Sequence, residues 1–438
     1  MKRILLSLLI LLPLASPGAS LRLEGDRVWL EGEGASLITV LGMFERCGID
    51  VLVDPTLELG RVPGSWENAK VERVISQLAS PHTYMMEWEL ENGPLGTFYR
   101  IASIRIFSDG KESAVKRLDE ARKVLDVVEG ANGVKYIRSE IMIGFGDGAT
   151  EADLNALLQL LNGTLIEVID PPGIYRIRIG DDMTVEDALE LALAQDKVQG
   201  AEPNLAFPRS ESVALPVVGT SEGVNLHLEP GEVAVAVLDS GLDPQYADMP
   251  FIRGTYNAID PSSSIYDPTG HGTLTSLIAS GALTPAGGTP ADVGVPVLSI
   301  LTFDENGMTS SDAVMRALDY AYNSGVSIAT MSWGSEVDSS FLQASMDYAA
   351  ANGMTLYASA GNEPTGTPIY PAGYDSVIAV GGLNPDGSVW ENSNYGDFVE
   401  IYDMAVATLD GQTYAGTSIA SPYAAYKAAA STVPVPAE

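Results

Sequence analysis

Three short segments, far apart in the chain, carry the residue types of a nucleophilic catalytic site. Ser418 lies in Gly416-Thr417-Ser418, His271 is flanked by Gly270 and Gly272, and Asp239 ends an apolar run. A serine hydroxyl is a weak nucleophile, and it needs a base to take its proton and an acid to orient that base. The three segments together supply one residue for each of these roles.

Ser418 is expected near the beginning of a helix. An Ala-rich segment, Tyr423 to Ser431, follows it, and Pro422 suits a first helical turn, where its missing N–H costs little. The free N–H groups at a helix N-terminus favour developing negative charge. Gly-Thr-Ser also occurs as an ordinary helix cap, so the segment by itself leaves a structural role open.

His271 is the best candidate for the base among the three histidines of the chain. Glycines flank it, and the apolar helical run Leu274 to Ala282 follows, so the imidazole is presented at a helix start. His82 follows Ser80-Pro81 and is expected in a surface turn. His227 precedes the run Val233–Leu238 and is expected to be structural.

Asp239 follows the unbroken apolar run Val233–Leu238, which predicts a fully buried parallel strand. The C-terminal ends of such strands are where open α/β sheets bind ligands. Strands continue to alternate with helices up to Val377–Val380, which favours βαβ units and a parallel sheet flanked by helices.

The three motifs resemble, in this chain order, the active-site motifs of subtilisin-like serine proteases, the subtilases. The resemblance covers about residues 231–433 and implies a triad of Asp239, His271 and Ser418. It also implies an oxyanion role for Asn362 in Ser359-Ala360-Gly361-Asn362. Two substrate-pairing strands are implied as well, formed by Gly307, Met308 and Thr309 and by Ser332, Trp333 and Gly334. Trp333 is bulkier than the aliphatic residue usual in the family, and a core role is equally open for it.

Leu274 and Tyr423 stand where the family usually has further histidines. Neither position belongs to the triad, so the differences concern local packing. Two function classes therefore remain: a serine endopeptidase acting on peptide or protein substrates, and a catalytically inactive, peptide-binding pseudoprotease of the cell envelope.

The region before the catalytic domain divides into smaller parts. The expected organisation is a signal peptide (1–20), a small α+β domain (21–107), a charged linker (108–138) with an exposed helix Val115–Val128, a second small α+β domain (139–209), a linker (210–230) and the catalytic domain (231–438). Residues 139–209 show a β-α-β-β-α-β order that ends in Ala201-Glu202-Pro203-Asn204. They resemble a subtilase inhibitory propeptide, which implies an intramolecular partner and self-cleavage between Phe207 and Val213. A permanently attached binding domain is the alternative.

The first small domain contains Gly48-Ile49-Asp50-Val51-Leu52-Val53-Asp54-Pro55. This string resembles the short N-terminal domain of secretins and TonB-dependent receptors, which implies a partner protein in the cell envelope. An unrelated α+β domain fits the same pattern equally well.

Composition narrows the partners and the compartment. The net charge is -34, and from residue 211 onward three basic residues face 26 acidic ones, which excludes nucleic acid as a partner. The acidic charge leaves calcium binding possible, but no Asp-x-Asp-x-Asp-Gly loop occurs, so no motif supports it, and the chemistry requires no cofactor. Lys2-Arg3, an apolar run and a small-residue end predict export, either secretion or placement in the periplasm or envelope.

The single cysteine, Cys47, allows no internal disulfide and is expected in the core.

Overall fold

The computed structural model describes residues 20–432, apart from 33–36, 48, 55–56, 58–61, 94–95, 109, 113–114, 118–124, 131–132, 181–182, 210–223, 225, 230, 262, 264, 291–293 and 410. The chain divides into two compact units, Met1–Val124 and Leu125–Glu438. The predicted signal peptide, except for Ser20, and most of the predicted linker 210–230 lie outside the described residues. None of the described helices is both long and apolar enough to cross a membrane.

The first unit is an α+β domain with its own core. Its elements are β1 (Ser20–Glu24), β2 (Arg27–Glu31), α1 (Leu37–Arg46), β3 (Asp50–Val53), β4 (Trp66–Lys70), α2 (Val71–Ala79), β5 (Thr83–Gly93), β6 (Gly96–Phe107) and β7 (Lys116–Arg117). They form two sheets, β1-β2-β4 and β5-β6-β3-β7. The apolar face of α1 is buried, with Val40, Leu41 and Phe44 fully covered. Cys47 lies at the edge of this core and is only partly buried, so the prediction of a buried thiol was too strong.

The predicted exposed helix Val115–Val128 is wrong for the residues that the structure describes. Lys116–Arg117 pairs with β3, and β8 (Val127–Glu129) pairs with the following strand β9 (Lys135–Phe145). The mixed charge suggested a solvated helix, but strand partners that are distant in sequence decide the backbone here, as commonly happens for short segments. Residues 118–124 lie outside the described part.

The second unit begins with a small domain, here defined as β8 to β12. Its elements after β9 are α4 (Glu151–Leu160), β10 (Thr164–Ile169), β11 (Ile174–Arg178), α5 (Val185–Leu193) and β12 (Val198–Pro208). The predicted β-α-β-β-α-β order is confirmed. Thr150 and Asp153 form a capping box, and Thr184 caps α5. The sheet starts at β8, inside the stretch predicted as a linker.

The remainder of the second unit is the large domain, an α/β fold. Its elements are β13 (Val235–Asp239), the short 3-10 helix η1 (Pro244–Tyr246), β14 (Ile252–Asn257), α6 (His271–Ala279), β15 (Val297–Leu301), β16 (Met308–Ser310), α7 (Ser311–Asn323), β17 (Ile328–Met331), α8 (Ser340–Ala351), β18 (Thr355–Ser359), β19 (Val377–Leu383), β20 (Val399–Met404), β21 (Val406–Leu409), β22 (Gln412–Ala415) and α9 (Thr417–Thr432). Seven strands pair in parallel in the order β14-β15-β13-β17-β18-β19-β20. The fold class predicted from the sequence is confirmed.

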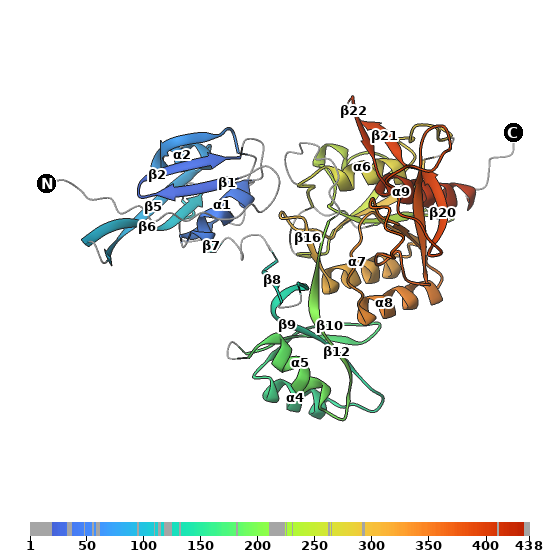
Figure 1. Ribbon diagram of the computed structural model, residues 1–438, viewed down its shortest axis with the longest axis horizontal. Coiled ribbons are helices and arrows are strands. Elements are labelled where there is room, and N and C mark those ends of the chain that lie inside the picture. Colours follow the sequence, from blue (N-terminus) through green and yellow to red (C-terminus); the bar gives the residue numbers. More distant parts are fainter. Residues whose placement is uncertain are drawn as a thin grey trace. The chain divides into compact units, whose positions relative to one another are not determined.

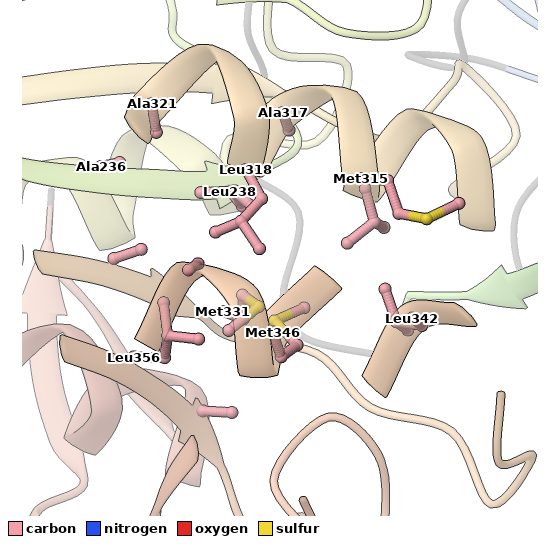
Figure 2. Close-up of a cluster of buried hydrophobic side chains, with 14 of the residues drawn as sticks. Ala236, Leu238, Met315, Ala317, Leu318, Ala321, Met331, Leu342, Met346 and Leu356 are labelled. Atoms are coloured by element: carbon pink, nitrogen blue, oxygen red, sulfur yellow. The ribbon is translucent and has the colours of Figure 1, made fainter. Parts of the chain in front are cut away.

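Helices cover both faces of this sheet. On one face α7 and α8 pack on a core that includes Leu238, Leu318, Met331 and Met346, as Figure 2 shows. On the other face α6 and α9 pack on a second core and on each other. Because the central strands are buried on both sides, their sequences are almost entirely apolar.

The two domains of the second unit share a strand. β12 pairs with β9 in the small domain and continues until Ala206, Phe207 and Pro208 pair antiparallel with Ser310, Thr309 and Met308 of β16 (Figure 1). The small sheet therefore ends on an edge strand of the large domain, in the order β10-β11-β9-β12-β16.

Candidate active site

The strand order of the large sheet changes direction at β13, the strand that ends with Asp239. β13 lies between β15 and β17, and the chain leaves it toward β15 on one side and returns to β17 on the other. Such switch points open a crevice at the carboxyl ends of parallel strands. Asp239 is the last residue of β13, so its side chain lies at that end.

Two glycines let helix α6 begin close to Asp239. Gly241 adopts a φ of +102°, and a Cβ atom there would lie 1.9 Å from the carbonyl oxygen of Tyr266. A Cβ atom on Gly272 would lie 2.3 Å from the carbonyl oxygen of Gly241. A side chain on Gly272 would force the helix away from the strand end, and one on Gly241 would collide with the backbone that precedes the helix.

Asp239 and His271 form a buried pair. Both are 1% exposed, and His271 Nδ1 lies 2.7 Å from Asp239 Oδ1. The carboxylate oxygen favours the tautomer with the proton on Nδ1, which leaves the lone pair on Nε2. His271 Nε2 is buried and has no hydrogen-bond partner among the described residues. The imidazole is thus held with its basic nitrogen ready to accept a proton.

Ser418 is the second residue of helix α9 and is 4% exposed. Its carbonyl oxygen accepts a hydrogen bond of 3.0 Å from Ser332 Oγ, which ties the helix start to the end of β17. Because α6 and α9 pack together, the helix start that carries His271 and the helix start that carries Ser418 belong to neighbouring elements. The predicted position of Ser418 at a helix N-terminus is confirmed.

Asn362 is fastened to the same helix start. Its Oδ1 accepts hydrogen bonds of 2.9 Å from both the N–H and the Oγ1 of Thr417, so Nδ2 is left as the donor end of the amide. A Cβ atom on Gly416 would lie 3.0 Å from Ser418 Oγ and 3.3 Å from Asn362 Nδ2. The hydroxyl and the amide therefore flank one glycine that has no side chain to separate them.

The residues expected to pair with substrate have different surroundings. Ser332 and Trp333 are 1% exposed, and a Cβ atom on Gly334 would lie 2.4 Å from Ile369 Cδ1. Trp333 belongs to the core, as the alternative interpretation held, and it also packs against Phe207. Met308 and Thr309 belong to the edge strand β16 that pairs with β12, and Gly307 directly precedes it.

The chain continues along this edge as far as Arg209, whose N–H donates to the carbonyl oxygen of Gly307 at 2.8 Å. The Arg209 side chain donates to Thr269 Oγ1, two residues before His271. Burial lowers the pKa of Arg209, although Asp239 and Asp267 oppose that shift. A segment of the small domain therefore occupies the edge strand beside the candidate triad. The predicted cut window, Phe207 to Val213, starts in this segment, and Ser210–Val213 lie outside the described residues.

Sequence reasoning missed a polar cluster that supports the His271 helix. Asp267 accepts hydrogen bonds from Ser240 Oγ at 2.8 Å and from the N–H groups of Gly270 and Thr273 at 2.8 Å. Its carboxylate thus satisfies donors at the beginning of α6. The sequence contains one indication of this role, because Asp267 is an acidic residue four positions before His271 and the N-terminus of a helix favours negative charge.

A buried ion network joins the small and large domains. Arg176 of β11 lies 2.6 Å from Asp312 of α7 and 2.7 Å from Glu140 of β9. Arg316 lies 2.6 Å from Glu167 of the small domain and 2.7 Å from Asp312. Burial alone would raise the pKa of Asp312, but Arg176 and Arg316 outweigh it and hold that pKa below its usual range.

Two further carboxylates bridge the domains. Glu202 of β12 accepts hydrogen bonds from Ser339 Oγ at 2.7 Å and from the Ser340 N–H at 2.8 Å, at the N-terminus of α8. Asp304, which is fully buried before β16, accepts a bond of 2.9 Å from the N–H of Leu125. Burial raises the pKa of Asp304 to about 7 despite the backbone donors.

Two family models match successive parts of the chain. Residues 231–433 match the model of the subtilase family, and residues 122–204 match that of the fervidolysin N-terminal prodomain. The second match starts before residue 139, in keeping with the early start of the small sheet. The chain is also similar in fold to the crystal structure of fervidolysin from Fervidobacterium pennivorans, a keratinolytic enzyme related to subtilisin. The TM-score is 0.53 at 21% identity, and the match covers 69% of this chain and 55% of that one.

Individual relatives point to the same family. A thermophilic serine proteinase of Bacillus sp. (strain AK1) is 32% identical over 204 residues, which cover 44% of this chain and 51% of the relative. Subtilisin Savinase of Lederbergia lenta is 30% identical over 203 residues, which cover 45% of this chain and 75% of the relative. The chain therefore belongs to the subtilase family. It spans about half the length of the first curated relatives that it matches.

Proposed function

We propose that this protein is a serine endopeptidase that hydrolyses peptide bonds with Asp239, His271 and Ser418. The observation that carries the proposal is the buried 2.7 Å pair of Asp239 and His271, which leaves Nε2 as the basic atom of an imidazole on α6, a helix that packs against the helix of Ser418. Membership of the subtilase family and the serine protease relatives support it.

In the proposed reaction, His271 Nε2 takes the proton from Ser418 Oγ while the oxygen attacks the substrate carbonyl carbon. Asp239 holds the imidazole in the required tautomer and stabilises the imidazolium that forms. Asn362 Nδ2 and the Ser418 N–H donate to the oxyanion, and His271 then protonates the leaving amine. A water molecule then attacks the acyl-enzyme, and His271 Nε2 takes its proton and passes it to Ser418 Oγ as the acyl–oxygen bond breaks. None of these steps requires a cofactor.

We further propose that the small domain is an intramolecular inhibitor that Ser418 cuts away. Its strand β12 lies on β16 as an added strand, the way extended peptides bind to a sheet edge, and it runs up to Arg209 beside the helix of His271. The match to a prodomain model supports this assignment. We expect the cut between Phe207 and Val213, after export from the cytoplasm.

The test compares the wild type with Ser418→Ala, both without residues 1–20. Labelling by a fluorophosphonate and an intact mass that begins in the window Phe207–Val213 are expected for the wild type alone. A wild type that resists the label while it still binds peptides would replace the proposal with the pseudoprotease alternative. Equal cutting of both proteins would assign the cut to an external protease.

The location and the first unit add two finer proposals. We propose that the protein acts outside the cytoplasm, either secreted or in the cell envelope, as the N-terminal segment predicts. A relative described as the minor extracellular protease Epr of Bacillus subtilis (strain 168) supports export. An envelope protein as partner of the first unit stays a prediction. Cell fractionation of an epitope-tagged chain, with and without the first unit, tests both.

A further inference from the structure

The carboxylate of Asp267 lies between the end of β13 and the beginning of α6 and is 1% exposed. Its Oδ1 accepts hydrogen bonds of 2.8 Å from Ser240 Oγ and from the Gly270 N–H, and one of 3.1 Å from the Thr269 N–H. Its Oδ2 accepts bonds of 2.8 Å from the Thr273 N–H and 2.7 Å from Thr273 Oγ1. All of these partners are donors, so the position fits a side chain that accepts at both oxygens, as an ionised carboxylate does.

Two hydroxyl groups join the same two segments to each other. Ser240 Oγ donates to Asp267 and accepts a bond of 2.8 Å from the Gly272 N–H. Thr273 Oγ1 donates to Asp267 and accepts a bond of 2.8 Å from the Asp243 N–H. Because a hydroxyl has one proton, donation to Asp267 leaves the lone pairs of each oxygen for the N–H of the opposite segment. Asp267, Ser240 and Thr273 therefore form a clamp between the end of β13 and the beginning of α6.

The clamp lies directly beside the proposed acid and base. Asp239 precedes Ser240, and its Oδ1 accepts a bond of 2.7 Å from the Ser240 N–H. The same Oδ1 lies 2.7 Å from His271 Nδ1. His271 stands between two glycines, and the N–H groups of both donate to the clamp. A shift of either segment at the clamp would therefore change the hydrogen bond between Asp239 and His271.

We propose that Asp267 is a positioning residue of the catalytic site, whose ionised carboxylate fixes the distance between Asp239 and His271 through the clamp. The proposal rests on the endopeptidase function proposed above, and it adds a residue that acts only through the acid and the base. Asp267→Asn replaces one acceptor oxygen by an NH2 group, which faces a donor in either orientation of the amide. A misplacement of about 1 Å caused by a change outside the reacting groups lowers a rate about 10²-fold.

Kinetics of the chain without residues 1–20 test this role. We expect Asp267→Asn to lower kcat for a peptide substrate about 10²-fold with little change in KM, because only the alignment of the pair is disturbed. The control is Asp403→Asn, the same change in a carboxylate that is 4% exposed on β20 and that pairs with Lys427. The control is expected to leave kcat nearly unchanged. An unchanged kcat in Asp267→Asn, or equal losses in both variants, would overturn the proposal.

A measurement without catalysis reads the geometry of the pair. The proton between His271 Nδ1 and Asp239 gives a downfield NMR resonance, and its chemical shift follows the length of that hydrogen bond. In the full-length Ser418→Ala chain, we expect Asp267→Asn to move this resonance upfield or abolish it, and Asp403→Asn to leave it in place. Thermal unfolding of each variant shows that it is folded. An unchanged resonance in folded Asp267→Asn would overturn the proposal.

Ser240→Ala decides the question if Asp267→Asn does not fold, because it removes one hydroxyl of the clamp and keeps the carboxylate. We expect a smaller upfield shift of the same resonance, and an unchanged resonance would then overturn the proposal. Where both variants fold, their combination should lower kcat by less than the product of the two separate effects, because they act on one unit.

The two kinds of measurement separate this proposal from the proposed function. If the wild type resists the fluorophosphonate and the resonance still moves in Asp267→Asn, the endopeptidase function fails, while the role of Asp267 in setting the Asp239–His271 distance stands. If the wild type is labelled and Asp267→Asn changes neither the resonance nor kcat, the positioning role alone fails.

Discussion

The ion pair of Arg176 and Asp312 gives the sharpest test of how the small domain is held on the large one. Arg176→Met removes a cation that lies 2.6 Å from Asp312 and 2.7 Å from Glu140, with all three side chains at most 4% exposed. Methionine keeps much of the volume of the arginine stem. The change therefore isolates the loss of charge and of charge-assisted hydrogen bonds.

The expected magnitude follows from burial and from the remaining partners. Breaking a buried pair by removing one member costs about 3–5 kcal/mol, because the other charge stays buried. Asp312 keeps Arg316, and Glu140 keeps Arg178 at 3.1 Å, so the lower end applies. We expect Arg176→Met to lower the free energy of unfolding of the second unit by about 3 kcal/mol.

The assay is a double-mutant cycle of Arg176→Met and Asp312→Asn in the full-length Ser418→Ala chain. Denaturant-dependent hydrogen exchange of peptides from β11 and α7 reports the free energy of unfolding for the second unit. The control cycle is Arg138→Met with Asp126→Asn, a pair at 2.8 Å whose side chains are 60% and 64% exposed. We expect a coupling of about 2–3 kcal/mol for the buried pair, and at most about 1 kcal/mol for the control. A coupling free energy for the buried pair no larger than that of the control pair would refute the argument that burial determines how strongly these ion pairs couple.

Three further predictions test single features. Burial raises the pKa of Asp304 to about 7, so the folded chain keeps a proton on Asp304 that the unfolded chain loses near pH 4. The contribution of Asp304 to the free energy of unfolding should therefore fall by up to about 1.4 kcal/mol per pH unit between pH 4 and pH 7. Urea titrations should show this slope reduced in Asp304→Asn, and equal slopes in both proteins would contradict the assignment. Gly272→Ala should abolish fluorophosphonate labelling, because its Cβ would meet the Gly241 carbonyl oxygen at 2.3 Å, whereas Gly294→Ala, with open space around it, should label normally. Asn362→Ala should lower kcat about 10²–10³-fold, the range known for one oxyanion donor in subtilisins, with little change in KM, and a kcat within threefold of the wild type would remove Asn362 from the oxyanion site.

The catalytic candidates could be predicted because local sequence determines their backbone. The apolar run before Asp239 has the length and burial pattern of a central parallel strand, and the strand is there. Gly241 and Gly272 stand where a side chain would collide with backbone, so glycine is required next to Asp239 and next to His271. Such glycines can be recognised in the sequence without knowledge of the distant parts of the chain.

The surroundings of the site could not be predicted in the same way. Nothing near Arg176 indicates that its partner is Asp312, which lies on a different domain. The stretch Val115–Val128 has helical propensity in isolation, but the strands at its two ends have partners supplied by β3 and β9. Pairings of this kind depend on which surfaces meet after folding, and a pattern in one segment does not contain that information.

The network between the domains has the arrangement that the proposed removal of the small domain requires. Arg316 and Asp312 pair within the large domain, and Arg176 and Glu140 pair within the small one. When the two surfaces part, each carries away an internally compensated pair, so separation leaves no single buried charge to penalise it. Within this network, separation breaks only the ion pairs that cross between the domains, and water then solvates their charges at newly exposed surfaces, where ion pairs contribute little. The same side chains are thus compatible with tight docking before the proposed cleavage and with release of the small domain after it.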